Sequence, residues 1–187
     1  MKLAILMSLA ALSSCSSEGG AGASAQQRTA TPELGANTVV LPASSGSQVR
    51  WLGHPEGTAY WDPTNEQVAR IASLLRPALE KGLAEPLLLD PAARDMPDRL
   101  AWVQTEVGLI LGQLEGYRRQ YIGIISHEGR IQILVRCFPG PDMDPDFPFE
   151  SWREEIVVVN DGGADYWYAV FDVEHGVLVH FDSNGYA

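Results

Sequence analysis

The architecture follows from two neighbouring stretches, YRRQYIGIIS (Tyr117 to Ser126) and RIQILVRCF (Arg130 to Phe138). Both show a period of two rather than 3.6, and β-branched residues dominate them, which is typical of β-strands. The residues between them, His127 to Gly129, form a short turn, so the two strands must run antiparallel. The sequence therefore predicts a β-hairpin here.

Three more strands are expected after this hairpin, in Glu154 to Asn160, Asp165 to Val173 and Val177 to Asp182. Short glycine-containing turns at 161–163 and 174–176 join them, which again requires antiparallel neighbours. The C-terminal part of the chain is therefore predicted to be an antiparallel meander of four to five strands.

Two helices are expected before these strands. Thr64 to Gln67 has the form of a capping box and begins the first helix, which Pro77 should kink or end, with Gly82 as its latest stop. The second helix begins at about Asp98, and its apolar stripe consists of Leu100, Val103, Val107, Ile110, Leu111 and Leu114. Helices followed by strands indicate an α+β fold, in which two helices pack on one face of the meander. This order is similar to that of cystatin-like folds.

Side-chain parity predicts which face of the meander the helices cover. The apolar set assigned to that face consists of Ile131, Ile133, Val135, Cys137, Trp167, Ala169, Phe171, Val177, Val179 and Phe181. The opposite face carries Gln132, Leu134, Arg136, Tyr166, Tyr168, Leu178 and His180. Aromatic residues beside arginine are enriched in binding surfaces, so the candidate binding surface consists of Arg136, Tyr166, Tyr168 and His180. The alternative is a wetted sheet face of ordinary cross-strand pairs.

The N-terminus carries the features of an export signal. Lys2 is followed by an apolar run, Leu3 to Leu12, that is too short to span a bilayer. The run ends in Leu12-Ser13-Ser14-Cys15, which resembles the lipobox of bacterial lipoprotein precursors. The resemblance implies removal of a signal peptide and acylation of Cys15, for instance with palmitate, so that the membrane is a partner through the N-terminal lipid. Ser16 resembles the signal for export to the outer membrane of the cell envelope in enteric bacteria.

The region after this cysteine has a different composition from the rest. Residues 16–47 are rich in small and polar residues and contain no aromatic side chain, so they are expected to be a disordered tether. The predicted division is a signal peptide at 1–14, the lipidated cysteine and tether at 15–47, and one α+β domain at 48–187. All five tryptophans and all six tyrosines lie in this domain.

The chain is acidic, with a formal net charge of −11. This charge argues against nucleic acid as a partner and against electrostatic docking on anionic lipid. It is compatible with cationic partners or divalent ions.

Motifs for catalysis are missing from the sequence: it contains no HExxH, GxSxG, P-loop, GxGxxG or CxxC pattern, so we assign no catalytic residue and no cofactor. Asp142, Asp144 and Asp146 have the alternate spacing of calcium ligands, with Glu150 beyond them. However, Phe147 and Arg153 occupy the positions at which an EF-hand has glycine and glutamate. A solvated acidic loop without a metal is therefore expected, with its far end held by Phe147, Phe149 and Trp152.

Cys137 has no internal partner if Cys15 carries lipid. It is expected to be a buried small hydrophobe, the alternatives being a mixed disulfide with another molecule and a catalytic thiolate. An enzyme should bring at least two residues of one set within hydrogen-bond reach in a pocket. That set is Cys137, Glu155, Asp172, His180 and Asp182.

The C-terminal third resembles a recurrent module of uncharacterised bacterial lipoproteins and secreted proteins. The residues that carry the resemblance are Tyr117, Arg119 to Gly123, Asp161 to Gly163, Tyr166-Trp167, Phe171-Asp172 and Asn184 to Ala187. It implies no activity. The sequence thus favours a lipid-anchored envelope protein that acts as a binding or structural accessory, with an envelope protein as partner. The alternatives are an envelope hydrolase and an inhibitor-like module, although the Gln-x-Val-x-Gly loop of cystatins is absent.

Overall fold

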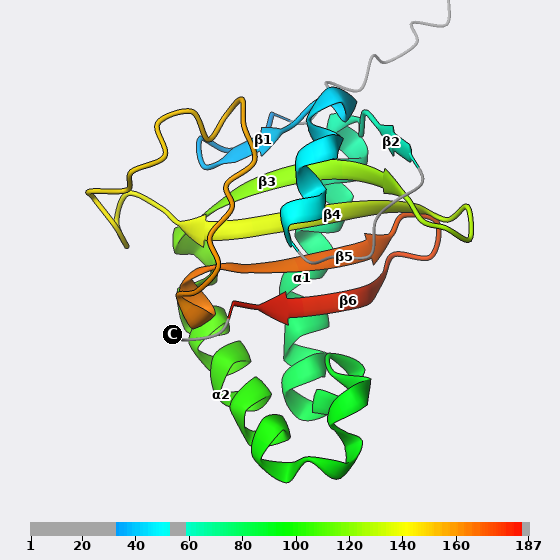
Figure 1. Cartoon of the computed structure of the whole chain (residues 1–187), viewed down its shortest axis with the longest axis vertical. Coiled ribbons are helices and arrows are strands. Elements are labelled where there is room, and N and C mark those ends of the chain that lie inside the picture. Colours follow the sequence, from blue (N-terminus) through cyan, green and yellow to red (C-terminus); the bar gives the residue numbers. More distant parts are fainter. Residues whose placement is uncertain (1–32, 53–58, 185–187) are drawn as a thin grey trace, which may run out of the picture. The chain divides into compact units, whose positions relative to one another are not determined.

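A mostly antiparallel sheet with two α-helices on one face is the frame of the molecule (Figure 1). The computed structural model describes residues 33–52 and 59–184 of the chain. Within these ranges six strands form one sheet: β1 Thr38–Val40, β2 Ala59–Trp61, β3 Tyr117–Ile125, β4 Ile131–Pro139, β5 Trp167–Asp172 and β6 Val177–Ser183. The two α-helices are α1 Asn65–Ala84 and α2 Pro97–Gln113. The predicted α+β fold class is confirmed.

Strands β3 to β6 form the predicted meander. Each pairs antiparallel with the next, and the order across the sheet is β1-β3-β4-β5-β6. Gly129, with a φ of 77°, closes the β3–β4 hairpin in a conformation that glycine adopts without strain. Two short strands that were not predicted flank β3, namely β1, which runs parallel to it, and β2, which runs antiparallel. In the described part of the chain, β6 pairs with β5 alone and forms an edge of the sheet.

Helix α1 begins with the predicted capping box. The Thr64 side chain accepts the backbone N–H of Gln67, and the Gln67 side chain accepts that of Thr64. The helix was expected to end at or before Gly82, but it continues through Pro77 to Ala84. Because Leu75 and Leu79 on either side of the proline are buried, packing holds the helix together across the missing backbone bond.

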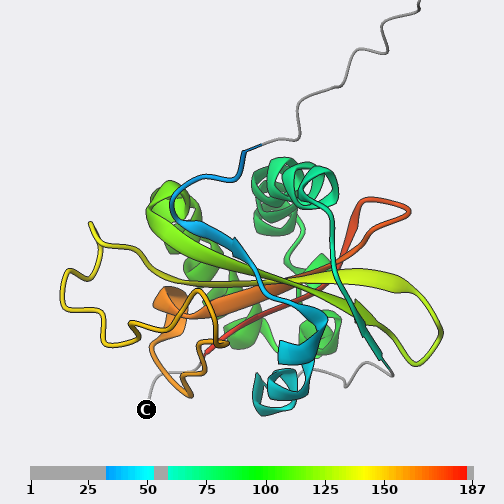
Figure 2. The ribbon, with the colours of Figure 1, turned by 90° about the horizontal axis from the view of Figure 1, so that it is seen from above.

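The core between the helices and the sheet contains most of the residues assigned to it from parity. The members that are buried there are Ile133, Val135, Cys137, Trp167, Ala169, Phe171 and Phe181. Ile131 is an exception, since it is 51% exposed at the beginning of β4. Figure 2 shows α1 on one side of the sheet and the 3-10 helix η1 (Ala43–Leu52) on the other.

A bulge in β6 changes the parity of its first residues. Val170 pairs with His180, but the next residue, Phe171, pairs with Leu178, so Val179 is an extra residue on β6. Such an insertion reverses the side on which the preceding residues point. Leu178 therefore packs with the helix-side core, and Val177 and Val179, which were expected there, are exposed.

The second face of the sheet is covered. Leu41 and Val49 pack on it from the N-terminal segment, and Ile156 packs on it from the connection between β4 and β5. The tether was predicted to extend to residue 47, but β1 and the buried Leu41 belong to the domain. The predicted boundary at residue 48 is therefore wrong in this part, because the predicted tether contains the apolar residues Val39, Val40 and Leu41, which pair with β3 or pack on the sheet. Residues 16–32 of the predicted tether lie outside the described residues, as do Cys15 and the signal peptide.

The segment predicted as a strand in Glu154 to Asn160 is not a strand. It crosses the second face of the sheet, and its backbone groups bond to side chains instead of a neighbouring strand. Gln120 donates to the carbonyl of Glu155 and accepts the N–H of Val157 at 3.0 Å. Its run of β-branched residues is explained by this half-buried position, in which the consecutive side chains of Ile156 and Val157 are both buried.

No helix in residues 33–52 and 59–184 combines the length and the apolar character that a membrane span requires.

Candidate functional site

The predicted binding surface is not an open face. Arg136 is 1% exposed and Tyr168 is 3% exposed, so neither can serve as an accessible contact. This part of the prediction is wrong, because the 154–160 segment covers the face that parity assigned to solvent. Tyr166 and His180 are partly exposed.

Arg136 is a buried clamp for that segment. Its guanidinium donates to the carbonyls of Val157 at 3.3 Å and Val159 at 3.5 Å, and no partner for its Nη1 occurs among the described residues. Burial lowers the pKa of Arg136 to about 10. Its guanidinium lies 6.0 Å from the centre of the Tyr168 ring, which stabilises the charge.

Tyr168 connects this buried region to the edge strand. Its hydroxyl lies 3.2 Å from Nε2 of His180 and donates to the Asp182 carboxylate at 3.5 Å. Burial lowers the pKa of His180 and raises the pKa of Asp182, so both side chains are shifted towards their neutral forms. The Tyr168 hydroxyl thus brings together His180 and Asp182, two of the residues from the set expected in an enzyme.

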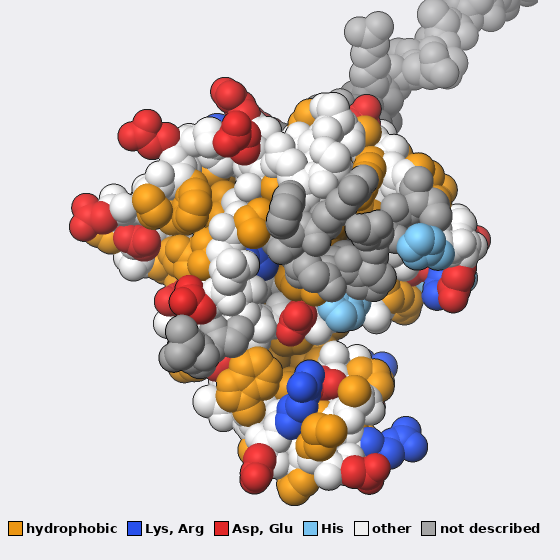
Figure 3. Space-filling view, viewed as in Figure 1, with side chains coloured by type: hydrophobic (Ala, Val, Ile, Leu, Met, Phe, Trp, Pro, Cys, Tyr) orange, Lys and Arg blue, Asp and Glu red, His pale blue; other side chains and the backbone are white. Residues whose placement is uncertain are grey.

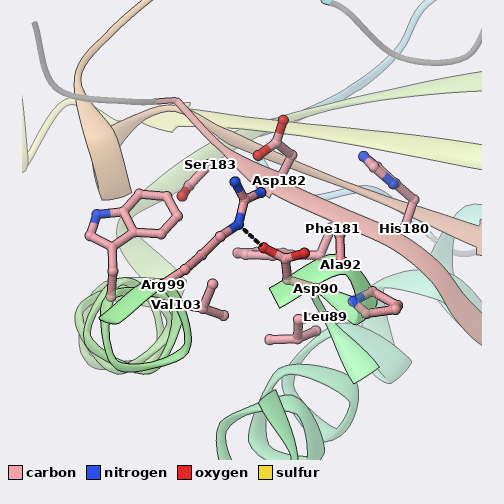
Figure 4. A pocket seen from close by; sticks show the side chains of 11 residues that line it. Leu89, Asp90, Ala92, Arg99, Val103, His180, Phe181, Asp182 and Ser183 are labelled. Carbon is pink, nitrogen blue, oxygen red and sulfur yellow. Dashed lines mark hydrogen bonds and ion pairs between the residues drawn. The ribbon is translucent and has the colours of Figure 1, made fainter. Parts of the chain in front are cut away.

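His180 and Asp182 also line a cleft of about 370 Å³ beside β6 (Figure 4). Its other wall is formed by Leu89 and Asp90, which follow the 3-10 helix η2 (Pro86–Leu88), by η3 (Pro91–Asp95) and by α2. Within it, the guanidinium of Arg99 forms an ion pair with the Asp90 carboxylate and points towards β6. The Ser183 hydroxyl also faces the cleft, and this buried oxygen has no hydrogen-bond partner in the part of the chain that the structure describes.

An apolar groove of about 290 Å³ lies at the other end of the same edge. Its lining from β6 and the turn before it is Gly176, Val177 and Leu178, and its opposite wall is Leu74, Pro77, Ala78, Lys81 and Leu88. We call the segment 81–103, which borders both cavities, the helical ledge. Figure 1 shows the ledge extending beyond β6. The edge of the sheet is thus bordered by an apolar groove followed by a polar cleft.

Exposed apolar side chains gather around this edge. Seven large apolar side chains are exposed in the described residues, and five of them belong to the ledge or to β6: Leu87, Leu88, Met96, Val177 and Val179. Figure 3 shows apolar side chains exposed below the sheet on the face that it presents. Edge strands in soluble proteins are usually protected from pairing by charged residues, proline or a covering segment. Val177 and Val179 leave the first half of β6 without such protection.

Some backbone N–H and C=O groups of β6 point outward from the free edge of the sheet. Asn184 donates its backbone N–H to Tyr166, and the register pairs Asp182 with Tyr168. Because successive residues of an antiparallel strand point their backbone groups to opposite sides, those of Phe181 and Ser183 face outward. The Ser183 N–H interacts with the Asp182 carboxylate and opposes the burial-driven rise in the pKa of Asp182. Chemically, this edge offers donors and acceptors in the pattern that an extended peptide requires.

The other residues singled out from the sequence lie elsewhere. Cys137 is buried on the helix side of the sheet, where burial raises the pKa of its thiol to about 12. Asp142 and Asp144 border a hollow of about 550 Å³ together with Tyr166. In residues 33–52 and 59–184, no group of three or more acidic, histidine or cysteine side chains is arranged to hold a metal ion.

The acidic loop is attached at its far end, as predicted. Phe147 stacks on Phe138 with ring centres 5.2 Å apart, and Trp152 packs edge-on against Phe138 at 5.8 Å. Phe149 lies 5.1 Å from Phe147.

One further histidine and carboxylate pair occurs in the turn between β5 and β6. His175 Nδ1 lies 3.0 Å from Asp172, whose pKa is lowered mainly by the backbone N–H of His175. This same backbone bond closes the turn, which accounts for the pair structurally.

The sequence reasoning missed Asp90, Arg99 and Ser183. Asp90 and Arg99 lie on either side of the predicted helix start at about Asp98, and their pairing across nine residues has no periodic signal. The chain matches no protein-family model, no curated protein and no solved structure.

Proposed function

We propose that this protein is a lipid-anchored binding protein of the bacterial cell envelope that holds an extended peptide segment of an envelope partner along β6. The observation that carries the proposal is the edge strand itself, with outward-facing backbone groups between an apolar groove and a polar cleft. A peptide can add to such an edge as a further strand, with affinity from main-chain hydrogen bonds and specificity from pockets for alternate side chains.

The helical ledge favours a peptide over a second copy of the chain. Two copies joined antiparallel through β6 would be related by a twofold axis perpendicular to the sheet, so both helix layers would lie on the same side. Each ledge extends beyond its own β6 (Figure 1) and would occupy the space required by the other copy. A single extended segment needs only about 5 Å beside the strand.

The anchor belongs to the same proposal. The lipobox-like sequence ending in Cys15 supports acylation and attachment to the envelope membrane, with the outer membrane suggested by Ser16. Several acyl chains on one cysteine hold a protein on a membrane far more firmly than one chain does. Replacing Cys15 by Ala should release the protein from the membrane fraction, and a variant that still enters the detergent phase contradicts the anchor.

Ser183 allows a test of the edge with matched variants. Proline is tolerated in an edge strand where its missing N–H faces outward, so Ser183→Pro should keep β5–β6 pairing and remove one donor from the edge. Ser183→Ala retains that donor and removes only the hydroxyl. We expect Ser183→Pro to lose binding of an alternating Thr/Val peptide by at least about tenfold, and Ser183→Ala to bind within about threefold of the parent.

The measurement is fluorescence anisotropy of a labelled synthetic peptide with the full chain carrying Cys15→Ala, and circular dichroism confirms that each variant is folded. Equal binding by the two Ser183 variants contradicts the edge as the site. Dimerisation that depends on protein concentration and is abolished by Ser183→Pro would assign the edge to a second copy and overturn the peptide proposal.

A further inference from the structure

The cleft beside β6 has a buried polar group on the helix side of the sheet. Ser183 pairs with Trp167, whose side chain belongs to the core between the sheet and the helices. Cross-strand partners point to the same face, so the Ser183 side chain also points to the helix side. It is 6% exposed, and its Oγ, which faces the cleft (Figure 4), has no hydrogen-bond partner among the described residues. Because an unpaired buried hydroxyl is costly and rare, this group points to a ligand that enters the cleft.

The opposite wall of the cleft presents both donors and acceptors. Arg99, Trp102 and Val103 are three and four residues apart on α2, so they share one face of this helix, and all three line the cleft. Arg99 donates through Nε to Oδ2 of Asp90. This bond leaves the two Nη groups of Arg99 as donors and Oδ1 of Asp90 as an acceptor. A ligand in the cleft is therefore met by hydrogen-bonding groups from two sides.

The charges that line the cleft are already compensated or point away from it. Asp90 and Arg99 form an ion pair. Asp182 pairs with Tyr168, which packs on the second face of the sheet, so its carboxylate lies on that face and accepts from the Tyr168 hydroxyl at 3.5 Å. Burial lowers the pKa of His180, which favours its neutral form. Among the described residues that line the cleft, an ionic ligand finds no uncompensated opposite charge, so a neutral polar ligand is favoured.

The size and the apolar lining of the cleft narrow the ligand further. Its volume of about 370 Å³ lies within the range of roughly 300–1,000 Å³ that small-molecule sites occupy. Trp102 is partly exposed and lines the cleft together with the apolar side chains of Leu89 and Val103. A sugar ring matches this combination, because its hydroxyl groups both donate and accept hydrogen bonds and its C–H groups form an apolar face that packs on an indole ring.

We propose that the cleft binds a neutral sugar ring, such as one in a glycan of the cell envelope. The apolar face of the ring packs on Trp102, and its hydroxyl groups bond to Asp90 and Arg99. One further hydroxyl bonds to the Oγ of Ser183. This site goes beyond the proposed function, because a sugar in the cleft does not require a peptide on β6.

Two neutral trisaccharides, triacetylchitotriose and maltotriose, are the probes. They differ in linkage and in N-acetylation, so they also show which kind of sugar is preferred. Each is added to the ¹⁵N-labelled full chain carrying Cys15→Ala, and the NMR shifts of the Trp102 indole and the Ser183 amide are followed. We expect saturable shifts at both positions with a Kd of about 1 mM or tighter for at least one probe. The absence of such shifts for both probes at about 10 mM overturns the proposal.

Variants of the cleft assign the contacts. Trp102→Ala should weaken sugar binding at least about tenfold, and Trp102→Phe, which keeps an aromatic ring, should restore part of it. Ser183→Ala should weaken binding about fivefold, because the sugar loses one hydrogen bond. Leu109→Ala is the matched control, since Leu109 is an exposed apolar residue of the same helix and does not line the cleft. Circular dichroism confirms that each variant is folded, and equal binding by Trp102→Ala and Leu109→Ala contradicts the site.

The glucosamine trimer tests the preference for a neutral ring. It has the ring and the linkage of triacetylchitotriose but carries an amine in place of each acetamido group. At physiological ionic strength it should bind no more tightly than the better neutral probe. If it binds more tightly and shifts the same residues, the carboxylates of the cleft select a cation and the proposal is wrong.

Peptide binding by the same variants separates this inference from the proposed function. Trp102→Ala should bind the alternating Thr/Val peptide within about threefold of the parent. If Ser183→Pro abolishes peptide binding and neither trisaccharide binds, the edge is a peptide site and the sugar site is wrong. If a trisaccharide binds and the peptide does not, the sugar site stands and the proposed function is contradicted.

Discussion

Individual buried polar side chains on the second face of the sheet position the segment that covers it. Gln120 and Arg136 face each other across β3 and β4, and both bond to backbone groups of residues 155–159. A side chain that satisfies backbone groups in this way replaces the hydrogen bonds of a missing strand. Parity correctly placed Arg136 on the face opposite the helices, but it could not show that this residue faces another segment instead of water.

The reactivity of Cys137 provides a direct test of how deeply a single side chain is buried. Burial raises the pKa of its thiol to about 12, so at pH 8 the reactive thiolate is suppressed and access is closed. In the full chain carrying Cys15→Ala, Cys137 should react with Ellman's reagent at least about a hundredfold more slowly than in 8 M urea. Rapid reaction of the folded chain would contradict the buried position and would restore the mixed disulfide and the thiolate as alternatives.

At the scale of elements, long-range pairing explains what the sequence analysis missed. The β3–β4 hairpin and the two helices carry local periodicity over nine or more residues, and they were predicted within a few residues of their bounds. β1 and β2 have three residues each and are defined by pairing with β3. Three residues carry no measurable period, so these strands could not be found from the pattern.

The bulge in β6 is a second feature that the sequence pattern could not reveal. VLVHFDS alternates as a regular strand would, and only its pairing with β5 shows that Val179 is inserted. The insertion moves Val177 and Val179 out of the core and leaves apolar side chains exposed at the edge. The groove therefore depends on a feature that is absent from local sequence.

A substitution at Gly123 tests the packing of β2 on β3. A Cβ at this position would lie 2.3 Å from the carbonyl oxygen of Trp61, whose indole N–H donates to the carbonyls of Ile124 and Gln132. Gly123→Ala should therefore lower the free energy of unfolding by about 1–3 kcal/mol, because the backbone of β2 must move. The measurement is urea unfolding followed by tryptophan fluorescence.

Gly108→Ala is the matched control for this substitution. Gly108 lies on the exposed side of α2 with nothing within 4 Å of the added carbon, so alanine should raise stability by about 0.5–1 kcal/mol. If both variants are as stable as the parent, the close approach of β2 to β3 is wrong.

At the scale of the whole molecule, the fold class and the helix-facing core were predicted from the sequence, and the site was predicted only in part. His180 was singled out as a surface residue, and it lies at the cleft. Arg136 and Tyr168 support that region from below instead of contacting a partner. The candidate site lies where the helical ledge, which runs from the end of α1 into α2, borders the last strand, and this proximity depends on the complete fold.

The central claim is that a peptide pairs with the main chain of β6. Hydrogen exchange followed by NMR on the ¹⁵N-labelled full chain carrying Cys15→Ala reports on this pairing residue by residue. On addition of the alternating Thr/Val peptide, the outward-facing amides of Phe181 and Ser183 should become protected, and those of β1 should be unchanged. Protection confined to other elements, or no change at Phe181 and Ser183 while the peptide is bound, would contradict the account.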